Sequence, residues 1–174
     1  MGTDAVSYDL SPMIRATSLL LLMAAAVSDV VRRIIPDRIC IALAALGMLT
    51  AALRGPRAML ASIAASAVLF AALALLHRRG MLGGGDVKLA SAFALGLPLS
   101  AVAGFLEMTA FAGGVLALLH LGLRPFAPRL APVRDGPLIR RVLAAECWRL
   151  RRHGSLPYGV AIACGGAIML LHGS

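Results

Sequence analysis

The chain has 174 residues, of which 60% are hydrophobic and 14% charged, and its mean hydropathy is +0.87. A soluble domain of this length is far less apolar, so the composition favours a helical membrane protein. The net charge is +9, but aromatic residues make up only 5% of the chain and the sequence holds no nucleic-acid-binding motif. We therefore expect the lipid bilayer, and no nucleic acid, as a partner.

The first expected membrane helix, Met13–Val31, follows a short acidic start that lacks the basic region of a signal peptide. Pro36 should end this helix near Ile35, because the residue before a proline disfavours helical backbone. Asp37 can then cap the second helix, which we place at Ile39–Leu53.

Four more apolar stretches follow, at Ala58–Leu76, from Asp86 to about Leu97, at Ala101–Leu123 and at Leu156–Leu171. The second and sixth helices have only 15 and 16 residues, and about 20 are needed to cross a typical hydrocarbon core. We see no internal repeat. The sequence thus predicts an all-α membrane helix bundle with about six transmembrane helices, forming a single domain over residues 1–174.

The basic residues predict the orientation of this bundle. If the loop after Asp29 is cytosolic, 14 of the 17 basic residues fall in the three cytosolic loops, as the positive-inside rule requires. Both termini then lie outside the cytosol. Residues 124–155 form the last cytosolic loop, which is either an amphipathic helix lying on the inner leaflet or a solvated basic segment.

In this topology Asp29 and Asp86 lie at the same depth, at the cytosolic ends of the first and fourth helices. An acid at a membrane helix end is costly unless it has a use. Three glycines, Gly83, Gly84 and Gly85, precede Asp86 and let the backbone approach a ligand closely. Two adjacent aspartates share one proton and can activate a water for attack on a peptide carbonyl.

Each aspartate also has a structural interpretation. Asp29 and Arg33 stand four residues apart and could form an ion pair along one helix. Asp86 could be the N-cap of the fourth helix, with the glycines as a turn. Among other polar residues, Glu107 and His120 fit interfacial or packing roles better than catalytic ones.

Three motifs carry a resemblance to a known family. The segment from Gly83 to Asp86 fits the G-x-G-D motif of intramembrane aspartyl proteases. Asp29, followed by Arg33, Ile35 and Pro36, resembles the first-aspartate motif of bacterial prepilin peptidases, D-x-x-x-R-x-I-P-N. Segments 84–89 and 156–161 are similar to that family in the same order, and they include Lys88, Pro157 and Tyr158.

The resemblance implies a membrane-embedded aspartic endopeptidase that cleaves prepilin leaders at the cytosolic face of the bacterial inner membrane. Asp29 and Asp86 match its catalytic aspartates. Asp37 departs from the family, which commonly has Asn there. Longer relatives carry paired cysteines and N-methylate the product; without such pairs this chain resembles the short form found with Tad/Flp pili, and we expect no methyltransferase activity.

The competing hypothesis is a non-enzymatic membrane assembly or transport component that uses the same aspartates as an ion or proton site. A transport path needs polar groups continuing across the bilayer, and only Glu107 lies deeper. No His/Cys cluster has zinc-ligand spacing and no nucleotide-binding loop is complete, so we expect neither a metal nor another cofactor.

Overall fold

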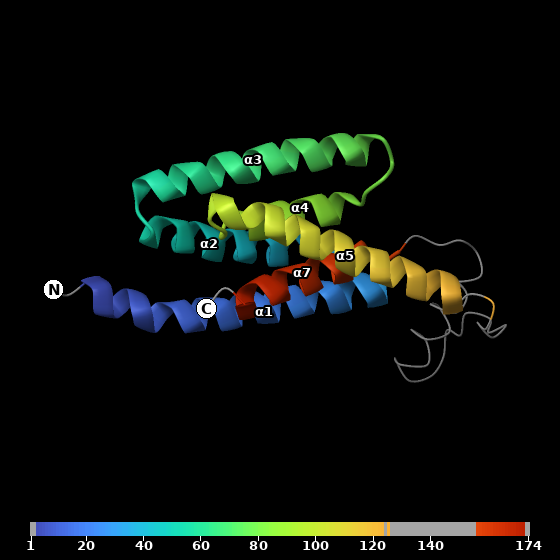
Figure 1. The fold of residues 1–174 in the computed structure, drawn as a ribbon, viewed down its shortest axis with the longest axis horizontal. Coiled ribbons are helices and arrows are strands. Elements are labelled where there is room, and N and C mark those ends of the chain that lie inside the picture. Colours follow the sequence, from blue (N-terminus) through green and yellow to red (C-terminus); the bar gives the residue numbers. More distant parts are fainter. Residues whose placement is uncertain (1–2, 124, 126–155, 173–174) are drawn as a thin grey trace.

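The computed structural model describes residues 3–123, 125 and 156–172, with side chains from residue 12 onward. The described part of the chain is all-α (Figure 1). Its helices are α1 (Thr3–Arg32), α2 (Asp37–Leu53), α3 (Pro56–Arg78), α4 (Gly84–Ala94), α5 (Leu99–Leu123) and α7 (Tyr158–His172). The prediction of an all-α fold is confirmed.

The helices run back and forth along one common direction (Figure 1). α1, α5 and α7 lie side by side, and α2 and α3 cover the other side of α4. Consequently the end of α1 and the starts of α2, α4 and α7 meet at one end of the bundle (Figure 1). This end carries both aspartates, and we call it the aspartate end.

α4 is the central helix. Eight of its 11 residues are buried, because neighbouring helices surround it. A helix of this length rises only about 16 Å, roughly half of the hydrocarbon core. Three helices of the described chain are long and apolar enough to cross a membrane: Pro12–Arg32 of α1, Pro56–Arg78 and Leu99–Leu123.

Close packing of small and aromatic residues holds α4 in place. The rings of Phe93 on α4 and Phe105 on α5 lie 4.9 Å apart, centroid to centroid, which is a favourable tilted contact. A Cβ on Gly47 of α2 would lie 2.8 Å from the backbone nitrogen of Gly96. The absence of side chains on both glycines therefore lets the two backbones touch.

The helix bounds differ from the predicted ones by several residues at most ends, and two differences matter for function. α4 begins at Gly84 and ends at Ala94, earlier at both ends than the sequence suggested, because two of the glycines join its first turn. Asp37 is not the cap of α2: Pro36 occupies that position and Asp37 is the first helical residue. The cap prediction was wrong.

Candidate active site

Asp29 lies in the last turn of α1 and is buried, with 7% of its surface exposed. The chain then leaves the helix through Arg33, whose φ of 56° is left-handed. The Ser28 hydroxyl donates a hydrogen bond to the carbonyl oxygen of Ile34 at 2.7 Å. This bond holds the chain in the turn that follows α1. The turn therefore keeps Asp29 inside the bundle while the chain continues into α2.

The backbone of α7 contacts Asp29 directly. The Gly159 N–H donates a hydrogen bond to Asp29 Oδ2, with an N–O distance of 2.9 Å. Gly159 is the second residue of α7, so its N–H is one of those that a helix leaves without an internal acceptor. The positive end of the helix dipole also favours a carboxylate there.

Asp86 lies in the first turn of α4 and is likewise buried, with 9% of its surface exposed. Burial, and after it the negative charge of Asp29, raise the pKa of Asp86 from 3.8 to about 6, so the two carboxylates are electrostatic neighbours. A hydrogen bond from the Gly83 backbone and the charge of Arg33 act in the opposite direction.

Asp86 is not the N-cap of α4, so the structural interpretation of Asp86 as a cap was wrong. The cap position belongs to Gly83, with φ −71° and ψ 143°, and Asp86 is the third residue of the helix. From there its side chain turns back to the Gly83 backbone, as the third residue of a capping box does.

Two of the three glycines before Asp86, Gly83 and Gly85, are required by crowding rather than by unusual backbone angles. A Cβ on Gly83 would lie 2.7 Å from Asp86 Oδ2, and one on Gly85 would lie 3.2 Å from the Ile35 Cβ. Gly84 has more room, with the His77 ring 3.4 Å from its hypothetical Cβ. Side chains at positions 83 and 85 would therefore press on the acid or on the segment that follows Asp29.

Lys88 lies on α4 but outside the pair of aspartates. Its Nζ donates a hydrogen bond to Asp37 Oδ1 at 2.7 Å, and both side chains are at least half exposed. The bond and the charge of Asp37 raise the pKa of Lys88. This ion pair joins the starts of α2 and α4, and the Asp37 carboxylate therefore has Lys88 as its partner.

The last predicted motif residues lie at the start of α7. Pro157 precedes the helix and Tyr158 is its first residue. A Cβ on Gly113 of α5 would lie 3.1 Å from the Tyr158 ring, so the ring packs closely against α5 at this glycine. Tyr158 therefore sets where α7 begins, and with it the position of the Gly159 N–H.

Sequence reasoning missed Gly159 and His77 as neighbours of the aspartate motifs. It included Ile35 in the first motif but did not place it against Gly85. Gly159 belonged to a segment noted for its resemblance, but nothing in the sequence paired it with Asp29. The Nδ1–H of His77 donates a hydrogen bond to the Leu82 carbonyl oxygen at 2.7 Å, which ties the end of α3 to the glycine turn. No local pattern distinguishes such a histidine from an interfacial one.

Glu107 is exposed on α5 and His120 is partly buried near the end of that helix. Among the described residues no group of three His, Cys, Asp or Glu side chains is arranged to hold a metal. The predicted basic segment 124–155 lies almost entirely outside the described residues.

Comparison with protein families identifies the family to which the chain and this candidate active site belong. Residues 16–118 match the family model described as the type IV leader peptidase family. The match covers more than half of the chain and includes both aspartates. The chain belongs to the type IV leader peptidase family.

This peptidase is therefore a membrane protein and an aspartic prepilin peptidase by family, and the family's substrates are prepilins. The predicted family and enzyme class are confirmed. No match was found among the curated proteins or the solved structures. The family match ends at residue 118, within α5, so α7 and its contact with Asp29 lie beyond it.

Proposed function

We propose that Asp29 and Asp86 are the catalytic pair, and that the peptidase cleaves leaders of Flp/Tad-type prepilins at the cytosolic face of the bacterial inner membrane. One observation carries this proposal. The two acids are buried at the same end of the bundle, and the charge of one raises the pKa of the other. Buried carboxylates coupled in this way are suited to share a proton.

The surroundings of the two acids support different roles for them. Asp29 accepts the N–H of Gly159 at the positive end of α7, which favours its ionised form. The raised pKa of Asp86 gives it a larger protonated fraction than an ordinary aspartate has. We therefore assign the base to Asp29 and the acid to Asp86.

The reaction then follows from these two states. Ionised Asp29 takes a proton from a water, and the resulting hydroxide adds to the scissile carbonyl carbon. Protonated Asp86 donates its proton to the carbonyl oxygen as the tetrahedral intermediate forms. When the intermediate collapses, Asp86 takes that proton back, and Asp29 gives its own to the leaving amine, so both acids return to their starting states.

The substrate has to bring its cleavage site to the aspartate end. A prepilin does so if its leader stays in the cytosol and its apolar segment enters the bilayer. The basic loops of the peptidase would repel a basic leader, so recognition rests on lateral contact with the apolar segment. The orientation, the multi-pass topology with about six membrane helices and the single domain 1–174 belong to this proposal.

The competing hypothesis, an ion or proton site in a non-enzymatic component, has less support. Such a path needs further polar groups inside the bundle, and Glu107 is exposed on α5 instead. The family match to peptidases also favours catalysis. No observation made on the described residues favours transport.

The experiment uses purified full-length protein in detergent with a synthetic Flp-type prepilin. Asp29→Asn and Asp86→Asn should each abolish cleavage, about a 10⁴-fold loss or more, because neither acid can replace the other. Asp37→Asn is the matched control, and it should cleave within a few-fold of the wild type since Asp37 pairs with Lys88. Substantial cleavage by either of the first two variants would refute the catalytic pair. A Flp-type substrate left intact while another prepilin is cut would refute only the subtype.

A further inference from the structure

A groove on the outside of the bundle begins at the aspartate end. It has a volume of about 620 Å³ and lies between α2, α3 and α4. Asp37, the first residue of α2, and Lys88 of α4 line its beginning, and Met48 of α2 lines it farther from the aspartates. Met48 follows Asp37 by 11 positions, so the groove extends about 16 Å along α2, roughly half of a hydrocarbon core.

The walls of the groove suit a second helix. Large apolar side chains that line it are exposed, and they are Ile41, Met48, Ile63 and Phe70. Five further lining residues are small: Ala44, Ser66, Ala67, Ser91 and Ala92. Within a bilayer, small residues let the backbone of another helix approach closely. The two charged residues that line the groove, Asp37 and Lys88, pair with each other, so the groove presents no net charge to an apolar helix.

Ser91 gives the groove a hydroxyl without an acceptor. Ser91 is 5% exposed, and its Oγ makes no hydrogen bond to any residue that the structure describes. Its carbonyl oxygen, in contrast, accepts the Ser66 hydroxyl at 2.8 Å. A buried hydroxyl without a partner costs free energy, and serine hydroxyls in membranes form hydrogen bonds across helices. A polypeptide in the groove has backbone carbonyls to offer, whereas a lipid acyl chain has no acceptor along its length.

The groove adjoins the candidate active site through both α2 and α4. Lys88 follows Asp86 by two positions on α4, and Asp37 follows Ile35 by two positions at the start of α2. Ile35 in turn packs against Gly85, next to Asp86. A polypeptide whose scissile bond lies beside Asp86 therefore reaches the groove by passing the start of α4.

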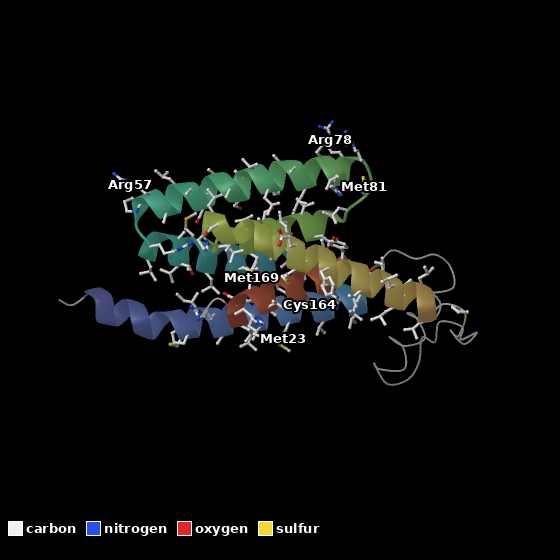
Figure 2. All side chains as sticks on the ribbon, in the orientation of Figure 1. Met23, Arg57, Arg78, Met81, Cys164 and Met169 are labelled. Atoms are coloured by element: carbon white, nitrogen blue, oxygen red, sulfur yellow. The ribbon has the colours of Figure 1, made fainter. Side chains whose placement is uncertain are left out.

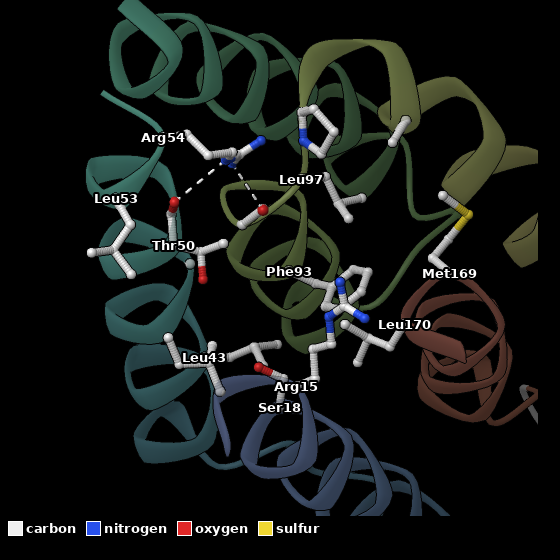
Figure 3. A pocket seen from close by; sticks show the side chains of 15 residues that line it. Arg15, Ser18, Leu43, Thr50, Leu53, Arg54, Phe93, Leu97, Met169 and Leu170 are labelled. Atoms are coloured by element: carbon white, nitrogen blue, oxygen red, sulfur yellow. Dashed lines mark hydrogen bonds between the residues drawn. The ribbon is translucent and has the colours of Figure 1, made fainter. Parts of the chain in front are cut away.

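A second pocket lacks this connection. It lies toward the other end of the bundle, where Arg54 donates hydrogen bonds to the carbonyl oxygens of Gly96 at 2.9 Å and Thr50 at 3.4 Å (Figure 3). Leu43 and Phe93 are among its lining residues, whereas neither aspartate and none of the three glycines before Asp86 lines it. The groove, rather than this pocket, is thus placed to hold a part of the substrate.

We propose that the groove binds the apolar segment of the prepilin as a helix packed against α2, α3 and α4. The inference rests on the proposed function, because it takes a prepilin as the substrate. The segment enters beside Lys88 and extends toward Met48, and one of its backbone carbonyls accepts the Ser91 hydroxyl. This contact holds the cleavage site beside Asp86 while the rest of the segment stays in the bilayer.

Disulfide crosslinking tests the groove independently of cleavage. Purified full-length Asp86→Asn protein, with its three native cysteines replaced by serine, carries one new cysteine, and the Flp-type prepilin carries one at successive positions of its apolar segment. Phe70→Cys lies in the groove, whereas Val68 is exposed on the same helix and does not line it. Phe70→Cys should crosslink at least about five-fold more than Val68→Cys, because a disulfide needs Cα atoms within about 7 Å.

Three other outcomes of this experiment are decisive. Equal crosslinking of Phe70→Cys and Val68→Cys would overturn the proposal. Crosslinking of Phe70→Cys to a second copy of the chain, without prepilin, would assign the groove to a dimer and also overturn it. If the prepilin is crosslinked in the groove but the wild type does not cleave it, the catalytic proposal fails and the groove stands.

Kinetics of the cleaving protein test the shape of the groove. Ala67 lines it and is exposed, whereas Ala72 is exposed on the same helix and does not line it. Ala67→Trp fills the groove and should raise KM for the full-length prepilin about ten-fold, with kcat within a few-fold of the wild type. Ala72→Trp should leave both constants unchanged. An unchanged KM in Ala67→Trp would contradict binding in the groove.

Ser91→Ala tests the hydrogen bond to the substrate. KM should rise about three-fold, as expected for one hydrogen bond between membrane helices. The Tm of the free protein should not fall, because the hydroxyl has no partner among the described residues. A lower Tm with an unchanged KM would show that the Ser91 hydroxyl serves the fold alone, and would refute its contact with the prepilin.

Discussion

At the scale of single residues, the two aspartates are neighbours in unlike surroundings. Asp29 receives an N–H from the start of α7, whereas burial and the charge of Asp29 raise the pKa of Asp86 to about 6. Such different surroundings can make one aspartate the acid and the other the base, although their side chains are identical. It also has a consequence for stability that can be measured apart from activity.

We expect Asp86→Asn to be more stable than the wild type near neutral pH. The folded protein holds a proton on Asp86 up to about pH 6, and the pKa without the fold is 3.8. The stability that this proton provides is complete below the lower value and is lost as the pH rises through the higher one. Removing the acid should therefore stabilise the protein by on the order of 2–3 kcal/mol at about pH 7.5.

Thermal unfolding in detergent across pH checks this expectation. The gain from Asp86→Asn should shrink as the pH falls and vanish below about pH 4, where both states are protonated. Asp37→Asn is the control, since it breaks an exposed ion pair and should change stability by at most about 1 kcal/mol. A gain that does not depend on pH would contradict the assigned titration.

We expect two glycines, Gly159 and Gly83, to be required for activity, because a side chain at either position would press on a carboxylate. A Cβ at Gly159 would lie 2.8 Å from Asp29 Oδ2, and one at Gly83 would lie 2.7 Å from Asp86 Oδ2. Gly159→Ala and Gly83→Ala should each lower kcat/KM for prepilin cleavage about 100-fold, the usual effect of moving a catalytic group by about 1 Å.

Gly84→Ala is the matched control for these variants. It lies between Gly83 and Gly85 in the same turn, but its Cβ would meet only the His77 ring, at 3.4 Å. Activity within a few-fold of the wild type is expected. If all three alanine variants cleave equally well, crowding at the carboxylates is not the reason why positions 83 and 159 are glycine.

At the scale of elements, α7 supports the site although the family match does not reach it. Tyr158 begins this helix and packs on the α5 backbone at Gly113. Gly113→Ala should push the Tyr158 ring and shift the Gly159 N–H away from Asp29. We expect lower kcat and lower thermal stability, both measurable on the purified protein.

The neighbouring residue provides the control. A Cβ at Gly114 has open space, with no heavy atom within 4 Å, so Gly114→Ala should stabilise α5 by up to about 1 kcal/mol through helix propensity. It should leave cleavage unchanged. Equal effects of the two substitutions would indicate that α5 and α7 are not coupled through Tyr158.

Contacts within a few residues were predictable, and contacts across the chain were not. Local hydropathy and Pro36 placed the helices and put both aspartates at helix ends. The bond from Gly159 to Asp29 joins positions 130 residues apart, and that from Lys88 to Asp37 joins positions 51 apart. Helix packing alone determines such pairs. Asp37 shows the same limit: it is the first residue of α2 and pairs with Lys88, a contact that the sequence did not indicate.

At the scale of the whole molecule, the orientation in the membrane stays a prediction. Arg57 and Arg78 lie at opposite ends of α3, a candidate membrane span (Figure 2), so one cysteine at each position reports the two faces. In a background with Cys40, Cys147 and Cys164 replaced by serine, Arg57→Cys should react with an impermeant reagent added outside intact cells.

Arg78→Cys should react only after the cells are opened, because it lies at the aspartate end, where the positive-inside rule places the cytosol. A variant that still cleaves prepilin also shows that the fold has survived the cysteine replacements. The reverse labelling pattern would put the aspartates outside the cytosol. Cleavage would then follow export of the leader, and a leader that stays in the cytosol could not be the substrate.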